Sequence, residues 1–288
     1  MSEKMIFTNG RGDSIELGQQ SPYLLQMIEG LGGNEVEIQT QKAPFQDGSS
    51  YIDSLLDERE LNFELMILVE SPSELFERRR ELLNIFNPKL GKGSLQYLYP
   101  AGTKELEVVV SQPPIFPDGS GNQGLKYQKV IFSLLSPSPF WTDESTESKP
   151  LVAWLGALKF PLSFPTEMGT RGDSGILSNT GDVACPVEIE IKGYTKNPMI
   201  KNKTTGQFIK VNREIGYEEI LQISTAFGKK KADIIRSDGS IENAFNWINL
   251  NSVFWNLAVG ENEIEYTSES GENDSIVNVT WKNQYVGV

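Results

Sequence analysis

The sequence predicts a mainly β protein with one α-helix in its first half and an antiparallel β-sandwich in its second half. Short segments that alternate apolar and polar residues recur along the chain, which is the period of half-buried strands. In the second half, turn-forming residues separate these segments roughly every 8 to 12 residues, a spacing typical of antiparallel sandwiches. One segment, residues 71–86, has the period of a helix instead.

Eight stretches of the first half are predicted strands. They cover residues 5–9, 14–17, 23–29, 36–40, 61–67, 94–99, 105–110 and 125–135. The first two are expected to form a hairpin, because the Gly and Asp residues at positions 10–13 supply turn dihedrals. The stretch at 61–67 alternates clearly, which predicts a strand with one buried face.

A capping box opens the predicted helix. Ser71 is followed by Pro72 at the first helical position and by Glu74 three residues after the cap, which is the pattern of a helix N-terminus. Several apolar side chains are then expected near one helical face, with the three arginines at 78–80 largely outside it. The apolar residues are Leu75, Phe76, Leu82, Leu83 and Phe86. Asn87 and Pro88 end the helix, because the residue before a proline avoids the helical region.

The length and the junction composition predict two domains. A chain of 288 residues lies near the size at which single cores stop growing. A Ser/Pro-rich segment at 136–141 and an acidic, Ser/Thr-rich segment at 143–148 mark the boundary. We therefore predict a first domain over residues 1–143 and a second over residues 144–288.

Alternation continues in the second domain and predicts half-buried antiparallel strands. Val187, Ile189 and Ile191 alternate with charged residues, so one strand face is apolar and the other is charged. The segment 277–281 alternates in the same way. No helix beyond a short turn is expected in this half.

Composition excludes several classes of function. The 26 basic and 39 acidic residues give a net charge of −13, which argues against binding to nucleic-acid backbones or anionic membranes. The chain has no histidine, so the commonest general base and metal ligand are missing. Cys185 is the single cysteine, and we expect a buried structural thiol. No signal peptide is apparent at the N-terminus and no run approaches the ~18 apolar residues of a membrane span, so we expect synthesis in a cytoplasm.

Four short motifs are expected to be turns rather than binding sites. Residues 119–124 (GSGNQG) match the dinucleotide fingerprint, but they lead into a predicted strand and not a helix, which favours a hairpin loop. Arg-Gly-Asp occurs at 11–13 and 171–173, where two turn-forming residues happen to follow an arginine. The three lysines at 229–231 are expected to form a solvated turn.

Paired carboxylates are the candidates for catalysis. Glu188 with Glu190, and Glu261 with Glu263, stand two residues apart, so on a strand both members of a pair face solvent. Solvated carboxylates keep ordinary acidity, whereas a catalytic acid needs burial to raise its pKa. We therefore expect no enzyme activity, with no catalytic, cofactor-binding or metal-binding residue.

Aromatic residues near the end of the chain have two interpretations. Trp247, Phe254 and Trp255 lie close together in the sequence, and a sugar-binding sandwich would stack a sugar ring on such residues. Packing into the sandwich core is the more frequent role of tryptophan on a short strand.

The order and spacing of several motifs resemble the distal tail proteins of long-tailed phages that infect Gram-positive bacteria. In the second half these motifs occupy residues 179–181, 185–193, 197–198, 202–206, 237–239, 252–262 and 277–288. In the first half they occupy residues 46–49, 59–63, 86–88, 93–95 and 138–141. Each motif alone is weak, but their order is hard to obtain by chance.

The resemblance implies a structural baseplate hub in the phage tail tip, assembled in the bacterial host cytoplasm. Its first domain would form a homo-hexameric ring, with an extended arm at residues 39–59 that embraces the neighbouring subunit. Its second domain would be a galectin-like sandwich. The expected partners are the major tail tube protein, the tail-associated or tail fibre protein and the receptor-binding protein. DNA would pass through the ring without sequence-specific binding, and no membrane insertion is expected.

Two alternatives remain open from the sequence. One is a carbohydrate-binding sandwich that aids adsorption to the host cell wall, and the other is an enzyme that degrades a wall polymer. No connection in the second half is long enough for the inserted carbohydrate-binding module of larger family members, so direct host binding is less expected.

Overall fold

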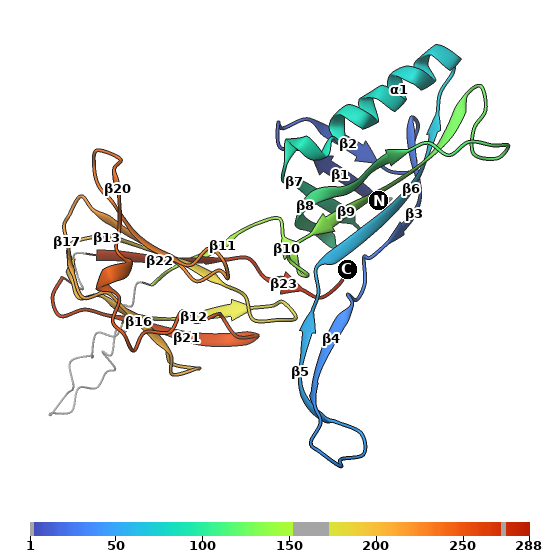
Figure 1. The fold of residues 1–288 in the computed structure, drawn as a ribbon. Coiled ribbons are helices and arrows are strands. Elements are labelled where there is room, and N and C mark those ends of the chain that lie inside the picture. Colours follow the sequence, from blue (N-terminus) through green and yellow to red (C-terminus); the bar gives the residue numbers. More distant parts are fainter. Residues whose placement is uncertain (1–2, 152–172, 272–274) are drawn as a thin grey trace, which may run out of the picture. The chain divides into compact units, whose positions relative to one another are not determined.

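A computed structural model of the chain describes residues 3–151, 173–271 and 275–288, and it contains two compact units. The first unit comprises Met1–Glu144 together with Tyr285–Val288, and the second comprises Ser145–Gln284 (Figure 1). The last four residues, which we expected in the second domain, thus belong to the first unit. The expected boundary at 143–144 stays a prediction, because compact packing does not show that either unit folds alone.

The first unit is built on an antiparallel sheet of nine strands. Seven strands run in the order β2-β1-β7-β8-β9-β6-β3, while β10 pairs with β8 and β23. The strands are β1 Lys4–Thr8, β2 Ser14–Leu17, β3 Tyr23–Glu29, β6 Arg59–Leu68, β7 Gly93–Tyr99, β8 Gly102–Ile115, β9 Tyr127–Ser136, β10 Trp141–Asp143 and β23 Gln284–Tyr285. The predicted β1–β2 hairpin is confirmed, with Thr8 paired to Ser14 across the turn.

Helix α1 (Pro72–Ile85) begins where the capping box predicts. The Ser71 side chain accepts a hydrogen bond from the Glu74 backbone N–H, and Pro72 takes the first helical position. A short 3-10 helix, η1 (Pro88–Leu90), follows. The expected core face was wrong in part, because Phe76 and Leu83 are 66% and 47% exposed. Leu75, Leu82 and Phe86 are buried as expected, together with Ile85. Phe76 and Leu83 lie to one side of this buried stripe.

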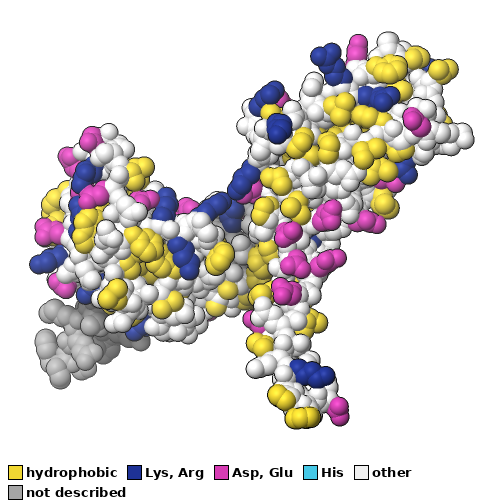
Figure 2. All heavy atoms as spheres, in the orientation of Figure 1, with side chains coloured by type: hydrophobic (Ala, Val, Ile, Leu, Met, Phe, Trp, Pro, Cys, Tyr) yellow, Lys and Arg dark blue, Asp and Glu magenta, His cyan; other side chains and the backbone are white. Residues whose placement is uncertain are grey.

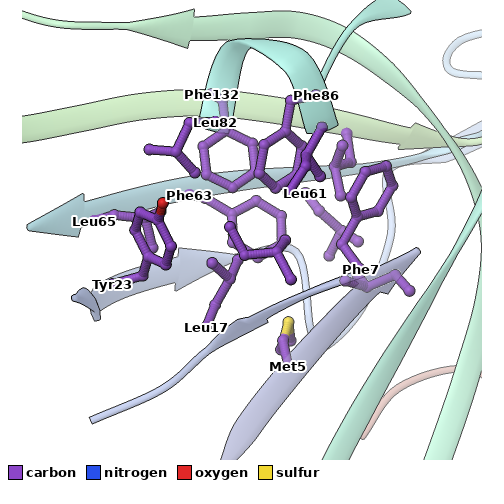
Figure 3. Close-up of a cluster of buried hydrophobic side chains, with 14 of the residues drawn as sticks. Met5, Phe7, Leu17, Tyr23, Leu61, Phe63, Leu65, Leu82, Phe86 and Phe132 are labelled. Atoms are coloured by element: carbon purple, nitrogen blue, oxygen red, sulfur yellow. The ribbon is translucent and has the colours of Figure 1, made fainter. Parts of the chain in front are cut away.

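An aromatic cluster joins the helix to the sheet (Figure 3). Phe86, just after α1, lies with its ring centre 4.3 Å from that of Phe132 on β9. Phe132 stacks on Phe63 of β6 at 4.8 Å, and Phe7 of β1 stacks on Phe86 at 4.7 Å. Leu61, Leu65, Leu82 and other buried side chains surround these rings. Four phenylalanines from the helix end and three strands thus form the centre of this core.

A separate two-stranded ribbon leaves the first unit. Strands β4 (Val36–Gln41) and β5 (Ser50–Leu56) pair only with each other among the described residues. They extend beyond the end of the β3–β6 pair, as Figure 1 shows. The sequence predicted the first of these strands, but it gave no alternation for the second. The resemblance led us to expect an arm at residues 39–59, whereas the ribbon with its loop covers residues 36–56 and Arg59 already belongs to β6. We call residues 36–56 the arm.

The second unit is an antiparallel sandwich, as predicted. One sheet has the order β11-β22-β13-β18-β19-β20, and another has the order β12-β21-β15-β16. The strands are β11 Glu147–Leu151, β12 Asp173–Asn179, β13 Val187–Gly193, β15 Met199–Asn202, β16 Phe208–Lys210, β18 Ile220–Ser224, β19 Lys231–Ile235, β20 Ile241–Asn243, β21 Gly260–Thr267 and β22 Ser275–Trp281, with a small β14 (Thr195–Lys196)–β17 (Glu214–Ile215) pair. The one described helical segment of this unit is a 3-10 turn, η2 (Phe245–Trp247).

The predicted alternation of β13 fills the sandwich core. Val187, Ile189 and Ile191 are at most 1% exposed, while the glutamates between them face solvent. Trp255 and Tyr266 are among the largest fully buried side chains of this unit. Neither unit contains, within the described residues, a helix long and apolar enough to span a membrane.

Candidate functional site

The arm presents an uncovered apolar face. The strand register places Leu56 opposite Val36 and Ser54 opposite Ile38, so these side chains share one face. Tyr51 lies on the same face, since its hydroxyl is 2.9 Å from the Ser54 hydroxyl. Ile52 is the extra residue at the register shift between Asp53 and Tyr51. Ile38, Tyr51 and Ile52 are 63%, 65% and 57% exposed.

The opposite face of the arm is mainly polar. It carries Glu37, Gln39 and Asp53, with Leu55 as its apolar member. A two-stranded ribbon is only marginally stable by itself in water. An exposed apolar face on such a ribbon is typical of a surface that binds a partner.

The tip of the arm holds a fully exposed phenylalanine. Phe45 has a φ of 64°, which is uncommon for a bulky residue, and its side chain is open to solvent. The Gln46 side chain accepts a 3.0 Å hydrogen bond from the Ala43 N–H and donates a 3.2 Å bond to Ser50. The loop is thereby held in a conformation that presents Phe45 outward.

An acidic cleft lies where the arm joins the sheet. It has a volume of about 570 Å³ and is lined by Glu35, Asp57, Glu58 and Glu60 together with Gly30 and Gly33 of the connection between β3 and β4, which we call the arm root. Figure 2 shows acidic side chains gathered at this root and hydrophobic side chains along the arm. The cleft therefore disfavours an anionic ligand.

A second exposed surface lies on α1. The Arg79 guanidinium stands 4.4 Å from the ring centre of Phe116 and 5.6 Å from that of Phe76. Phe76 and Leu83 are exposed beside it. This mixed apolar and cationic surface differs in chemistry from the arm and its acidic root.

The four predicted turn motifs fall as follows. Residues 119–124 form the loop between β8 and β9, so the dinucleotide fingerprint is excluded by its context, as predicted. The first Arg-Gly-Asp lies in the β1–β2 turn, with Gly12 at a φ of 91°. In the second copy, Arg171 and Gly172 lie outside the described residues. Lys229 and Lys230 are exposed in the turn before β19, whereas Lys231, also expected in the turn, is the exposed first residue of that strand.

The carboxylate pairs occupy solvent-facing positions. Glu190 pairs with Lys192 at 2.8 Å, and Glu263 pairs with Lys203 at the same distance. Glu188 and Glu261 are exposed. Within the part of the chain that is described, no three Asp, Glu or Cys side chains converge as a metal site. The arrangement offers the solvated carboxylates expected from the sequence.

The aromatic residues of the second unit divide between core and surface. Trp255 is 1% exposed and belongs to the core. The Trp247 ring is half-buried, with the Arg213 guanidinium 3.9 Å from its centre. Phe245, which is 45% exposed, stacks on the partly buried Phe254, and their ring centres lie 5.5 Å apart. Sequence reasoning named Phe254 and did not name Phe245.

Cys185 is buried, in agreement with the prediction of a structural thiol. Burial raises the pKa of its thiol to about 12. The thiolate required for reactivity is therefore scarce at neutral pH.

Several asparagines of the quoted motifs are buried loop clamps. Asn262 donates to the carbonyls of Ala258 and Gly260, at 2.7 and 3.1 Å, and accepts from the Ala258 N–H at 3.0 Å. Asn179 likewise bridges the carbonyls of Val183 and Leu257. The motifs thus specify loop geometry rather than chemistry.

Sequence reasoning missed the role of Arg59, the first residue of β6. Its side chain is fully buried and lies in phase with Leu61 and Phe63, which fill the core. The alternation of the strand could have revealed this, since an arginine at a core-facing position requires buried hydrogen-bond partners.

Comparisons with known proteins agree with the fold. Residues 10–134 match the family model of the phage tail protein RIFT-related domain. Residues 180–285 match that of the siphovirus-type tail component, C-terminal domain. No curated protein sequence matches the chain.

Solved structures of phage tail proteins share the fold over the whole chain. The Dit protein of phage SPP1, described as a paradigm of the hub adsorption apparatus in phages that infect Gram-positive bacteria, aligns with a TM-score of 0.68 and 13% identity, covering 96% of this chain and 98% of that one. Two structures of the phage p2 baseplate in its activated conformation, with Ca and with Sr, align at 0.55 and 12% identity over the full length of both chains. With both halves matched by siphophage tail models, the chain belongs to the distal tail (Dit) protein family of siphophages and is a component of the phage tail tip.

Proposed function

We propose that six copies of the chain close into a ring that joins the tail tube to the tail-associated protein and the receptor-binding apparatus. The observation that carries this proposal is the arm, whose apolar face lies uncovered. A contact between this face and a different surface of the next copy is heterologous, and such contacts generate rings when the rotation closes.

The energetics of the arm favour a contact between subunits. Burying one isoleucine side chain such as Ile38 or Ile52 contributes about 1.5–3 kcal/mol. Phe45 at the tip adds a larger apolar surface that can enter a pocket of the neighbour. Each copy in a closed ring would both give and receive this contact.

The charge of the chain suits a conduit for DNA. A net charge of −13 repels the phosphate backbone, so the polymer would pass through the ring without adhering. In this role the chain acts as a structural hub and performs no catalysis. Its solvated glutamate pairs are consistent with that role.

Ring formation is tested by light scattering behind size-exclusion chromatography, with negative-stain imaging. Six copies of 32.1 kDa give a particle of about 193 kDa with an open centre. Ile38→Asp places a charge on the apolar face, Ile52→Asp places one at the exposed register shift beside it, and both should leave monomers. Gln39→Asp places the same charge on the opposite face and should still give rings. Rings from Ile38→Asp and Ile52→Asp would show that the arm does not hold the assembly.

A second candidate function is carbohydrate binding by the second unit. It is favoured by the stacked pair of Phe245 and Phe254, because an exposed ring face can pack on a sugar ring. Titration with cell-wall glycans tests it, with Trp247 fluorescence as the reporter. Binding should weaken in Phe245→Ala and stay unchanged in Phe227→Ala, an exposed aromatic outside the pair. No change in fluorescence at any glycan concentration would dismiss this function.

A further inference from the structure

Arg59 is a buried cation held by backbone carbonyl groups. Its side chain is 0% exposed, and its guanidinium lies 5.9 Å from the ring centre of Trp141. It donates to the carbonyl oxygens of Gly30, Gly32 (2.6 Å), Pro139 (2.9 Å) and Val286 (2.5 Å). No carboxylate of the described residues pairs with it. Buried charges are normally paired, so this arrangement depends on all four carbonyls remaining in place.

The four carbonyls come from three distant segments. Gly30 and Gly32 lie in the connection between β3 and β4, which is the root of the arm. Pro139 lies in the Ser/Pro-rich segment before β10, and Val286 follows β23. A single side chain therefore fixes the arm root against two segments that are remote in the sequence.

The C-terminal segment also contacts the arm root directly. The Val288 N–H donates a 3.2 Å hydrogen bond to the Leu31 carbonyl. Gly287 lies so close to Gly32 that a side-chain carbon added at Gly287 would stand 3.2 Å from the Gly32 backbone. Gly287 and Val288 thus lie directly against the arm root, and Val286 is joined to it through the Arg59 side chain.

The arm root has little regular secondary structure that could set the direction of the arm. It contains Gly30, Gly32 and Gly33, and Gly30 has a φ of 93°. Glycines leave the backbone free to adopt many conformations unless other groups fix it. At the far side of the root, the Asp57 N–H donates to the Glu35 carbonyl, which joins the two arm strands to each other but not to the sheet.

We propose that Arg59 and residues 286–288 form a clasp that sets the direction of the arm before assembly. This inference rests on the proposed function, since a fixed direction matters when the arm must meet a neighbour. An arm already held in one direction loses less conformational entropy on binding than a freely hinged one. Arg59 is therefore a positioning residue for ring closure, although it lies away from the apolar face of the arm.

The direction of the arm is measured by the distance distribution between two spin labels. Gln41→Cys at the end of β4 and Glu77→Cys on α1 provide exposed labelling sites, and Cys185 is buried. Measured on monomers in dilute solution, the distribution should be narrow in the otherwise unchanged chain. Arg59→Lys removes the guanidinium that binds the four carbonyl oxygens, and Gly287→Val forces residues 286–288 away from Gly32. Each should at least double the width of the distribution.

Two matched variants serve as controls. Arg80→Lys makes the same exchange on the exposed face of α1, and Val288→Ala keeps the backbone bond to Leu31. Both should retain the narrow distribution. If Arg59→Lys fails to fold, Gly287→Val alone decides, because it leaves Arg59 in place. A width unchanged in Gly287→Val, and in folded Arg59→Lys, would overturn the clasp.

The protein concentration at which rings form is a second measurement, and it distinguishes the proposed ring from the proposed clasp. If both hold, the protein concentration needed for ring formation should rise about tenfold in Arg59→Lys and Gly287→Val, because the arm must then be ordered on binding. If the unchanged chain forms no ring but the two variants broaden the distance distribution, the proposed ring fails and the clasp stands. Rings that form at equal concentrations despite broadened distributions would overturn the role of the clasp in assembly.

Discussion

Arg59 and Val286 are separated by 227 positions in the sequence, and a 2.5 Å hydrogen bond joins the guanidinium of one to the carbonyl oxygen of the other. A second group of contacts holds the neighbouring residue. The Tyr285 hydroxyl donates to Asp143 at 3.2 Å, and the Lys104 ammonium lies 2.6 Å from the same carboxylate. The Lys104 ammonium also stands 3.3 Å from the centre of the Tyr285 ring. The first unit is thus completed by residues from the other end of the chain.

The ion pair beneath Tyr285 should matter more than an exposed one. The Lys104 and Asp143 side chains are 12% and 21% exposed, so Asp143→Asn leaves a largely buried ammonium without its carboxylate. We expect a loss of about 1–2 kcal/mol, between the values for exposed and fully buried pairs. Calorimetry of the thermal unfolding of the whole chain measures it. Glu16→Gln, which removes the more exposed pair with Lys4, should cost less than about 0.5 kcal/mol. Equal losses would contradict this ranking.

The aromatic cluster predicts a large effect in the first unit. Phe132 is fully buried between Phe63 and Phe86, so Phe132→Ala opens a cavity at the centre of the core. We expect a loss of about 3–5 kcal/mol in the free energy of unfolding. Leu125→Ala, at a 79% exposed position, should change it by less than about 0.5 kcal/mol. A small loss in Phe132→Ala would mean that the neighbouring rings close the cavity. Denaturant unfolding followed by circular dichroism gives both values.

The sequence predicted elements whose signals are local. Helix α1 begins at Ser71 and Pro72 because a cap and a fixed φ act within one helical turn. The buried face of β13 follows from the alternation of Val187, Ile189 and Ile191. Such features need no knowledge of distant residues. They account for the correct fold class.

The sequence could not predict features that depend on distant partners. Strand β5 shows no alternation because it covers no core and pairs only with β4 among the described strands. The contact of Val286 with Arg59 joins residues that only the folded chain brings together. Phe76 was placed on the wrong side of α1 because helical period gives a stripe but not the orientation of the helix on its sheet. The clasp therefore emerged only from the structure.

The buried thiol predicts how labelling and stability depend on pH. Burial raises the pKa of the Cys185 thiol to about 12, from its ordinary value of 9.0. A raised pKa in the folded state means that its contribution to stability is fully present below pH 9 and is lost as the pH rises toward 12. Native protein at pH 8 should therefore resist a thiol reagent, while urea-unfolded protein should react rapidly. Rapid reaction of the native protein with Ellman's reagent would show that the thiol is accessible.

The amide clamp of Asn262 predicts that stability depends on pH for one substitution at this position and not for another. The side chain is fully buried and serves the N–H of Ala258 and the carbonyls of Ala258 and Gly260. Asn262→Ala leaves these backbone groups without partners, which should cost about 2–4 kcal/mol in the free energy of unfolding at any pH between 4 and 8. Asn256→Asp, at an exposed position of the same loop, should be close to neutral.

Asn262→Asp keeps the shape and the acceptor but sets a carboxylate against two carbonyl oxygens. Burial and these oxygens disfavour the charged form, so the pKa of the new carboxyl should lie above its unfolded value of about 3.9. A raised pKa gives stability that is present below the unfolded pKa and is lost as the pH rises through the folded one. Asn262→Asp should thus be less destabilised at pH 4 than at pH 7, while Asn262→Ala loses the same amount at both. Urea unfolding at the two pH values, each relative to the unchanged chain, measures the difference. Equal losses for Asn262→Asp at both values would mean that the clamp tolerates a charge, because water reaches it or the loop opens.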